Sequence, residues 1–559
     1  MYVSRRMVLE VAACAVTVLL GSALFSLPGR AQDRRPNVVL IVADDLGYSD
    51  LGSFGGEIKT PNLDSLASVG IRFTQFYTSA VCSPSRSMML TGSDNHIAGL
   101  GNMAEFTAPN QKGKPGYEGH LNDHVVSVAS LLKDSGYHTY MAGKWHLGEE
   151  PNYYPAARGF SRDLTLIPGG GSYFDDMWGE RGQKQPYTQD GKLIDAVRPG
   201  FYSTEDYTDA IIKDIEDGRA DGKPFFAYLA YQAPHDPFQL PDDWLDKYKG
   251  RYDRGYDVTR AERIERMKRL GILHPQSTVF PRLPNVPAWV SLSDEERRQS
   301  ARKMELYAAM VENMDSHIGR LFNYLREKNI YDNTLIIFLA DNGPEGNKAF
   351  SIGSPWDNSK FENWGKKGTF IQYGPAWAQV SAGMFRDFKG FLSEGGIRAP
   401  MIISGYGVND GGRTSSALAH IMDITPTILA VAGAAHPAIY NGQNIAPLQG
   451  KSLVPVLNDT RLSVRGPSDW LGWEIFGNRA LRQGDWKLVW ICPPHGPGDW
   501  QLYDVNADPA ETKDLARMRP DIKEKLRKHW VEYAQTNNVI LPNVSPICGK
   551  GELPGIEEE

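Results

Sequence analysis

The feature that most restricts the fold of this sequence is a series of short apolar runs that each lead into polar residues. The runs span residues 37–43, 139–142, 225–231 and 334–340. Continuous runs rich in Val, Ile and aromatic residues are typical of strands buried on both faces of a mainly parallel sheet. Segments 62–69, 125–135 and 302–328 lie between them and have the spacing of amphipathic helices. The alternation predicts an α/β architecture, in which ligands bind beyond the carboxyl ends of the strands.

The C-terminal part has a different pattern. Short runs at 479–482, 486–491 and 500–503 are separated by Gly and Asp, which predicts an antiparallel meander. A closing helix is expected to start at Pro520, because apolar residues then recur at 3.6-residue spacing through Tyr533. A chain of 559 residues is also too long for one core. We therefore expect a large domain at 32–460 and a smaller α+β domain at 461–559.

The first 31 residues are interpreted as a signal peptide. Two arginines precede a short apolar stretch that ends in small residues near Ala31, a plausible cleavage site. The segment SRRMVL also resembles a twin-arginine signal, so we expect a periplasmic or secreted protein. The alternative is an uncleaved anchor, but the stretch is shorter than the ~20 residues of a spanning helix. We expect no stable membrane insertion after signal removal. The formal charge of −7 gives no basic field for nucleic acid.

Polar residues after the apolar runs form a candidate metal site. Asp44 and Asp45 follow the first run, and Asp341 and Asn342 follow the last. All four offer oxygen ligands, which suit a hard cation such as Ca²⁺ or Mg²⁺. A single aspartate after a strand is more often a helix cap, but two pairs weaken that interpretation. Adjacent carboxylates also repel each other unless a cation or proton lies between them.

Positively charged or proton-bearing residues near these positions would neutralise a bound tetrahedral anion. They are Arg86, Lys144, His146, His235 and Lys389. The histidines are also candidates for proton transfer.

The segment AVCSPSRSMMLTG, residues 80–92, contains one of only four cysteines. Serines lie close to Cys82 in the sequence and a guanidinium follows it at Arg86, a setting that suggests chemistry rather than core packing. Cys14 lies in the predicted signal, which leaves Cys492 and Cys548 as a pair. These two form either a disulfide or two separate buried thiols, and sequence spacing does not decide between them.

Several sequence blocks resemble the sulfatase family, especially bacterial secreted or periplasmic arylsulfatases. CSPSR at 82–86 with LTG at 90–92 matches the family signature. ADDLGYSD at 43–50, GKWHLG at 143–148, APHDPF at 233–238, ADNG at 340–343 and EGGIRAP at 394–400 follow in family order. The resemblance implies an alkaline-phosphatase-like, mainly parallel mixed sheet flanked by helices. It also implies that a formylglycine-generating enzyme converts Cys82 to Cα-formylglycine.

The resemblance further implies a role for each candidate residue. Asp44, Asp45, Asp341, Asn342 and a diol oxygen of residue 82 would bind calcium, with magnesium as the alternative. Asp341 would take the proton of the attacking hydroxyl, and Arg86 and Lys144 would hold the diol and the sulfate. Lys389 and His235 would protonate the departing alcohol or phenol. His146 would take the remaining diol proton during sulfate release.

The predicted activity is therefore hydrolysis of a small-molecule sulfate ester, with aryl sulfates favoured. Two alternatives are a phosphonate monoester or phosphodiester hydrolase of the same superfamily and a non-catalytic binding protein. Aromatic residues in Gly- and Pro-rich segments are candidates for the mouth of the site, although most are expected to pack beneath the loops. They are Tyr173, Phe174, Trp178, Phe238, Trp356, Trp364, Tyr373 and Trp377.

Overall fold

The central feature of the computed structural model is a ten-stranded mixed sheet. The structure describes residues 35–347 and 355–548, so the predicted signal peptide lies outside the described residues. Five parallel strands form the middle of the sheet, in the spatial order β9, β1, β8, β4, β5. Their bounds are β1 Asn37–Ala43, β4 His138–Lys144, β5 Arg162–Leu166, β8 Phe225–Ala230 and β9 Thr334–Ala340. Three of these, β1, β8 and β9, are buried at every residue, as expected for continuous apolar runs covered on both faces.

Both margins of the sheet contain antiparallel pairs. On one side β10 (Met401–Gly405) runs antiparallel to both β9 and β2 (Ile71–Phe73). At the edge of the sheet, β11 (Arg413–Ser415) pairs with β2 in parallel. On the other side β6 (Tyr187–Gln189) and β7 (Lys192–Ile194) extend β5 in antiparallel fashion. The predicted mixed, mainly parallel sheet is confirmed.

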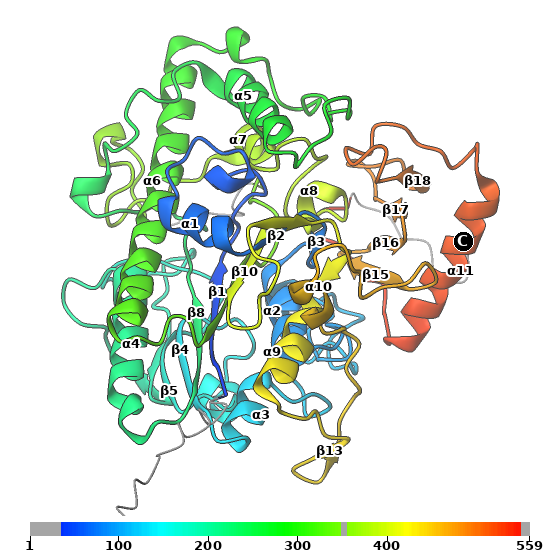
Figure 1. The fold of residues 1–559 in the computed structure, drawn as a ribbon. Coiled ribbons are helices and arrows are strands. Elements are labelled where there is room, and N and C mark those ends of the chain that lie inside the picture. The colour runs from blue at the N-terminus through cyan, green and yellow to red at the C-terminus, as the bar shows by residue number, and fades with distance from the viewer. Residues whose placement is uncertain (1–34, 348–354, 549–559) are drawn as a thin grey trace, which may run out of the picture. The chain divides into compact units, whose positions relative to one another are not determined.

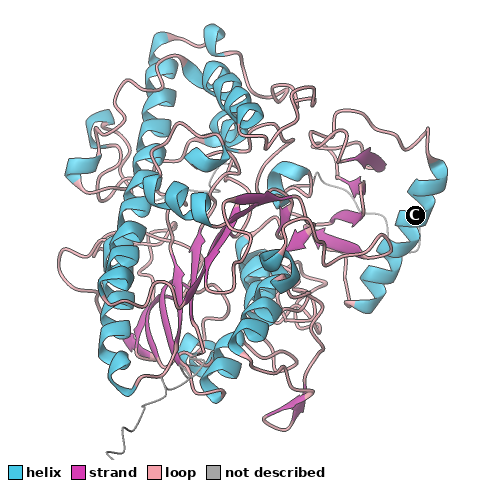
Figure 2. Cartoon of the chain, in the orientation of Figure 1, coloured by secondary structure: helices cyan, strands magenta, loops and turns pink. Residues whose placement is uncertain are grey.

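Helices cover both faces of the sheet (Figures 1 and 2). Contacts place α1 (Pro61–Val69), α4 (Ser203–Gly218) and α6 (Asp294–Glu327) together on one face. The other face carries a second group, α2 (Cys82–Thr91), α3 (Val128–Asp134) and α9 (Ile424–Ala432). Further helices that precede the C-terminal sheet are α5 (Gly255–Arg269), α7 (Gly374–Ser381), α8 (Glu394–Ile397) and α10 (Val454–Asn458). Two small sheets pair β3 (Phe76–Tyr77) with β12 (Ala419–His420), and β13 (Ile439–Tyr440) with β14 (Gln443–Asn444).

Two predicted helix boundaries are wrong, and in both cases a capping serine sets the true start. The helix expected from residue 125 begins at Val128, because the Ser127 hydroxyl accepts a hydrogen bond from Ser130 N. The helix expected from residue 302 begins at Asp294, because Ser293 and Glu296 form a capping box.

The C-terminal region has its own four-stranded antiparallel sheet, as predicted. Its strands are β15 Trp470–Ile475, β16 Asn478–Gln483, β17 Trp486–Trp490 and β18 Trp500–Asp504. Helix α11 (Pro520–Thr536) packs on this sheet, and its Trp530 indole donates a hydrogen bond to Trp473 O at 3.1 Å. Cys492 and Cys548 form a disulfide, which settles the two alternatives left open by the sequence. None of the helices within 35–347 and 355–548 combines the length and the apolar character needed to cross a membrane.

Candidate active site

The carboxyl ends of β1 and β9 bring the predicted oxygen ligands together. The two strands pair in parallel register up to Ala43 and Ala340, so the residues that follow them are neighbours. Asn342 Nδ2 donates a hydrogen bond to Asp45 Oδ1 at 2.6 Å, and Asp45 N donates to Asp341 Oδ1 at 3.3 Å. Asp45 has a positive φ of 61°, an uncommon backbone conformation for a residue other than glycine. The chain therefore turns sharply at the point where the carboxylates converge.

Cys82 is the first residue of α2 and faces the two carboxylates that follow β1. Its Sγ lies 3.4 Å from Asp44 Oδ1 and 4.0 Å from Asp45 Oδ1. Every residue of α2 is buried, so the helix holds the thiol in a fixed position beside the carboxylates that follow β1. Burial, and then the Asp44 carboxylate, raise the pKa of the Cys82 thiol well above its usual range. Because the thiolate is the reactive form, unmodified Cys82 is a poor nucleophile.

Three cationic side chains contact the same carboxylates. Arg86, one turn along α2 from Cys82, donates from Nε to Asp341 Oδ2 at 2.9 Å. Lys144 Nζ lies 2.5 Å from Asp44 Oδ2, and Lys389 Nζ lies 2.9 Å from Asp45 Oδ2. Burial by itself would raise the pKa of Asp44, but Lys144 and the neighbouring cations hold it well below its usual range. Asp44 is therefore an ionised buried carboxylate.

The two predicted histidines have different surroundings. His235 Nε2 lies 3.5 Å from Asp45 Oδ2, and its Nδ1 lies 2.6 Å from Asp236 O. Burial would lower the pKa of His235, but Asp45 raises it to about 10, so the imidazole is protonated at neutral pH. His146 instead pairs through Nε2 with Glu105, at 3.2 Å. A Cβ at Gly169 would lie 2.7 Å from the His146 ring, so this glycine leaves the room that the imidazole occupies.

We call the residues that meet at these strand ends the strand-end cluster. Its members are Asp44, Asp45, Cys82, Arg86, Lys144, His235, Asp341, Asn342 and Lys389. All nine were predicted as site residues, and His146 is the one predicted residue whose polar contact lies outside the cluster.

The donor set of this cluster fits a divalent cation. Ligand atoms of Asp44, Asp45, Cys82 and His235 lie within 4.8 Å of one another. Asn342 Oδ1 is buried and has no hydrogen-bond partner among the described residues, although its amide nitrogen is bound to Asp45. A buried acceptor without a donor is costly unless a cation or water satisfies it. Carboxylate and amide oxygens are the ligands that calcium and magnesium prefer.

Four further carboxylates lie next to the proton-bearing side chains, and the sequence did not single them out. Asp236 lies beside His235, with Oδ1 3.1 Å from Nδ1, and Glu345 Oε2 lies 3.3 Å from Lys389 Nζ. Ligand atoms of Glu180, Asp236 and His235 lie within 4.8 Å of one another. Asp236 lies within the APHDPF block and Glu345 follows the ADNG block closely, so a signal for both was present in the sequence. Glu180, like Glu105 beside His146, lies in a segment without a motif or apolar periodicity.

Burial, and then nearby carboxylates, raise the pKa values of two of these acids, Glu345 and Glu180. For Glu345 the carboxylates are Asp45 and Asp236, and for Glu180 the carboxylate is Asp236. Lys389 opposes the shift at Glu345, and His235 opposes it at Glu180. Several acidic groups therefore lie close together beside His235 and Lys389.

A small cavity adjoins the cluster and is lined by two of the eight aromatic residues that were expected at the site mouth. Phe238 and Tyr373 line it, together with Tyr307, Asp45 and Asp236. Five of the others support the site or pack elsewhere. The Tyr173 hydroxyl donates to His235 O at 2.7 Å, and Trp356 packs edge-on against Trp178. Phe174, which is half-buried, packs against Tyr202, and Trp364 packs against Phe361.

Trp377 is a correction to the set of aromatic residues expected at the site mouth. It is fully buried and packs against Tyr252, Tyr256 and Trp289, where its indole nitrogen donates to Ser300 O at 2.9 Å. Its place in a glycine-rich loop region suggested exposure, but the helix α7 that carries it turns the ring into the core.

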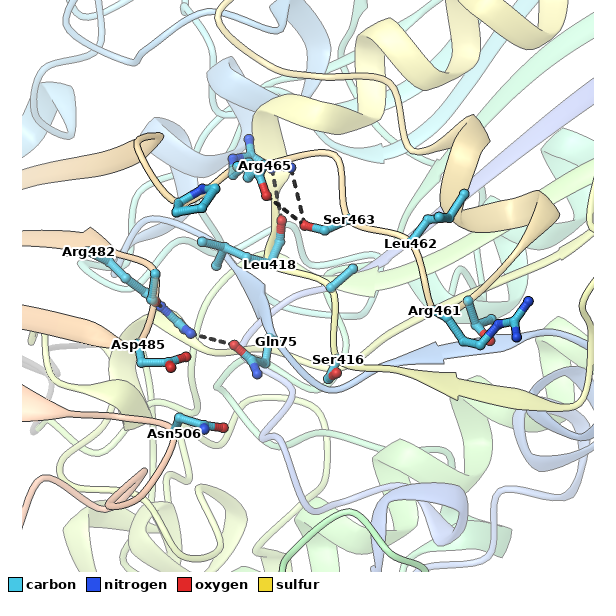
Figure 3. A pocket seen from close by; sticks show the side chains of 15 residues that line it. Gln75, Ser416, Leu418, Arg461, Leu462, Ser463, Arg465, Arg482, Asp485 and Asn506 are labelled. Carbon is cyan, nitrogen blue, oxygen red and sulfur yellow. Dashed lines mark hydrogen bonds between the residues drawn. The ribbon is translucent and has the colours of Figure 1, made fainter.

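A separate cavity of about 400 Å³ contains no member of the strand-end cluster. Figure 3 shows Arg465 and Arg482 among its lining residues, with Arg482 bound to Gln75. Arg465 is already paired with the buried carboxylate of Asp423 at 2.6 Å. Because these two arginines serve structural partners, we do not assign this cavity as the active site.

Comparisons with known proteins agree with this geometry. A sequence model of the sulfatase family matches residues 36–434. An uncharacterized sulfatase of Schizosaccharomyces pombe is 41% identical over 543 residues, covering 92% of this chain and 96% of that protein. The arylsulfatase of Klebsiella aerogenes is 39% identical over 451 residues, covering 79% and 95% respectively. The solved structure of Ps i-CgsB with a bound neocarrahexaose superposes with a TM-score of 0.64 at 25% identity, covering 90% of this chain and 94% of that one.

Proposed function

This chain belongs to the sulfatase family and hydrolyses sulfate esters, and we propose that its own substrates are aryl sulfates. The observation that carries the proposal is the position of Cys82, at the start of a buried helix between Asp44, Asp45 and Arg86. The aryl preference is supported by the aromatic side chains of Phe238 and Tyr373, which lie in the wall of the site beside Asp45. It is also supported by the 39% identity to an arylsulfatase.

The proposed nucleophile is derived from Cys82 by conversion to Cα-formylglycine, carried out by a formylglycine-generating enzyme. Hydrated formylglycine supplies a geminal diol, of which one hydroxyl attacks sulfur and the other allows sulfate to leave afterwards. The raised pKa of the thiol supports a modified residue, because burial and Asp44 disfavour the thiolate that direct attack would need.

The proposed metal is calcium, with magnesium as the alternative. Asp44, Asp45, Asp341 and Asn342 would hold it, and residue 82 would complete the set. The unpartnered Asn342 Oδ1 supports this assignment. The ion would supply positive charge that lowers the pKa of a hydroxyl beside it.

The remaining residues have roles that follow from their charges. Arg86 and Lys144 would bind and orient the sulfate oxygens through charge-assisted hydrogen bonds. Protonated His235 and Lys389 both pair with Asp45 Oδ2 and would donate a proton to the leaving oxygen. Asp341 would accept the proton of the attacking hydroxyl. His146 Nδ1, which has no partner among the described residues, would accept the second hydroxyl proton during sulfate release.

We also propose that the protein is exported to the periplasm or secreted. The disulfide between Cys492 and Cys548 supports an oxidising compartment. N-terminal sequencing of the mature protein tests this proposal, because a first residue close to Gln32 is expected after signal removal.

The test of the activity combines a peptide mass with two rates. The tryptic peptide that contains residue 82 is expected to show an aldehyde or its hydrate in place of the thiol. The protein is expected to release sulfate from a phenyl sulfate much faster than it cleaves the matching phenyl phosphonate. An unmodified thiol in fully active protein would contradict the nucleophile, and faster phosphonate cleavage would favour the phosphorus-ester alternative.

The proton-donor role of His235 has its own test. His235→Ala should reduce kcat/KM more for an alkyl sulfate than for an activated aryl sulfate, because only the poorer leaving group depends strongly on a proton. Equal losses for the two substrates would remove His235 from this role.

A further inference from the structure

Three carboxylates form an acidic rim on one side of the strand-end cluster, beyond its proton-bearing residues. Asp236, Glu180 and Glu345 make up this rim. They come from separate segments, because Asp236 follows β8, Glu345 follows β9, and Glu180 precedes β6. The fold therefore brings three acids together that are far apart in the chain.

The charges of the cluster are distributed unevenly. On one side, Arg86 and Lys144 contact Asp341 and Asp44, so cations match carboxylates there. On the other side, His235 and Lys389 contact Asp45 and also the three rim acids. Asp45 is a proposed ligand of the metal ion, so its charge is not counted here. Two cations then face the three rim carboxylates, and negative charge is in excess at the rim.

The rim borders the space that a leaving group would occupy. Asp236 and Glu345 line the small cavity beside Asp45, together with Phe238, Tyr307 and Tyr373. The cavity has a volume of only about 10 Å³, so it marks the wall of this side of the site and does not itself seat a ring. Substituents of a leaving group that is bound beside this wall would lie close to the two carboxylates. Aromatic faces combined with carboxylates favour a cation and disfavour an anion.

We propose that the acidic rim selects sulfate esters whose leaving group is neutral or cationic, and rejects those that carry a second anionic group. The inference rests on the proposed function and adds a charge rule to it. The matched side of the cluster attracts the sulfate, while the rim repels a second sulfate or a carboxylate. Glu345 and Asp236 are the specificity-determining residues of this rule.

The test uses three phenyl sulfates that differ only at the end of one para side chain, which carries a carboxylate, a primary amide or an ammonium group. We expect the wild type to prefer the amide and the ammonium substrate. Glu345→Gln should raise the carboxylate-to-amide ratio of kcat/KM about five- to tenfold, the size of one unit charge in a partly hydrated site. It should also lower the ammonium-to-amide ratio.

Ratios are compared because Glu345→Gln removes a partner of Lys389 and can change all three rates together. Asp236→Asn is the second variant and should shift both ratios in the same directions. Glu327→Gln is the matched control, since Glu327 is exposed and ends α6 before the chain enters β9 at the opposite edge of the sheet. Its ratios should equal those of the wild type.

Ionic strength gives a measurement that needs no variant. In the wild type, added salt should raise the carboxylate-to-amide ratio, because screening weakens the repulsion. Unchanged ratios in both rim variants, or a wild type that hydrolyses the carboxylate substrate as fast as the amide, would overturn the inference and leave the proposed function intact. Release of sulfate from none of the three substrates would contradict the proposed function itself.

Discussion

Two of the buried groups of charged side chains in the described part of the chain differ in how their charges are satisfied. The strand-end cluster lies at the carboxyl ends of the parallel strands. The second group, which we call the Glu394 cluster, joins the short helix α8 to the C-terminal sheet. Its members are Tyr77, Glu394, Arg398, Arg482, Lys487 and Glu511.

The Glu394 cluster is built of matched pairs. Lys487 Nζ lies 2.9 Å from carboxylate oxygens of both Glu394 and Glu511, and the Tyr77 hydroxyl donates to Glu394 at 2.6 Å. Burial would raise the pKa of Glu394, but Lys487 and Arg398 hold it at about 2. Its charges are used to connect two parts of the fold.

The strand-end cluster contains two features that the Glu394 cluster lacks. It places a thiol 3.4 Å from an ionised carboxylate, and it leaves Asn342 Oδ1 without a partner among the described residues. The comparison shows that buried charge alone does not mark an active site. A convergent set of oxygens around a potential nucleophile does, when one of them has no partner among the described residues, because structure by itself gains nothing from leaving it unpaired.

The largest expected effect is the loss of activity when Cys82 in the strand-end cluster is changed to Ala. We expect a loss of turnover of about 10⁴-fold or more, because no other residue of the cluster replaces the nucleophile. The melting temperature should change little, since one small neutral group is removed. Sulfate release and thermal unfolding are the measurements. Ser83→Ala is the matched control on the same buried helix, and inactivity of this variant would point to a disturbed helix instead.

The Glu394 cluster should respond in the opposite way when Lys487 is changed to Met. The variant leaves two buried carboxylates without their common cation, which should cost about 3–5 kcal/mol of unfolding free energy. The folded fraction should keep kcat within a few-fold of the wild type. Denaturant unfolding and kcat measured on the same samples separate the two effects. A triple variant that also carries Glu394→Gln and Glu511→Gln should recover much of the stability.

Removal of divalent cations should affect the strand-end cluster. A chelator should abolish activity and lower stability by about 3–4 kcal/mol, if the ion is normally present at several hundred times its Kd. Calcium should restore both better than zinc does, because the ligands are oxygens. Asn342→Ala should weaken the response to calcium, whereas Asn323→Ala, an exposed asparagine on α6, should not. Stoichiometric zinc without calcium or magnesium would contradict the assignment.

A smaller effect, on the pH dependence of the unfolding free energy, is expected from His96. This residue is a buried cation that links the central region to the C-terminal sheet. His96 lies 2.8 Å from Asp94 and 3.2 Å from Glu474 on β15, and the Tyr533 hydroxyl also donates to Asp94. Burial would lower the pKa of His96, but Asp94 and Glu474 raise it to about 9. This cation loses its proton within an accessible pH range.

The stabilisation from His96 should be fully present below pH 6.5 and should be lost as the pH rises through about 9, because its folded pKa is raised. The shift corresponds to about 3 kcal/mol. Denaturant unfolding at pH 6 and pH 9.5 measures it. His96→Gln should remove most of this pH dependence, and His274→Gln, at an exposed histidine, should retain it. A flat profile in the wild type would show that the histidine is neutral in the fold.

The sequence predicted the central sheet and the meeting of the polar residues after β1 and β9 for one reason. Continuous apolar runs indicate buried parallel strands, and parallel strands end at the same edge of a sheet. The residues after β1 and β9 therefore had to be neighbours, whatever else the chain did. The family resemblance implied a mixed sheet, but the positions of the antiparallel strands β10, β6 and β7 were not predicted, because short runs carry little information about direction.

What the sequence determined by itself about this protein is the set of parallel strands, the polar residues that follow them and the motif around Cys82. Only the tertiary structure decided which isolated acids join them. Glu180 and Glu345 lie in loops whose position depends on how distant segments pack, and the pairing of Cys492 with Cys548 depends on the geometry of the folded C-terminal region. Local periodicity reports which face of an element is buried, but it does not specify which loops meet across the edge of a sheet.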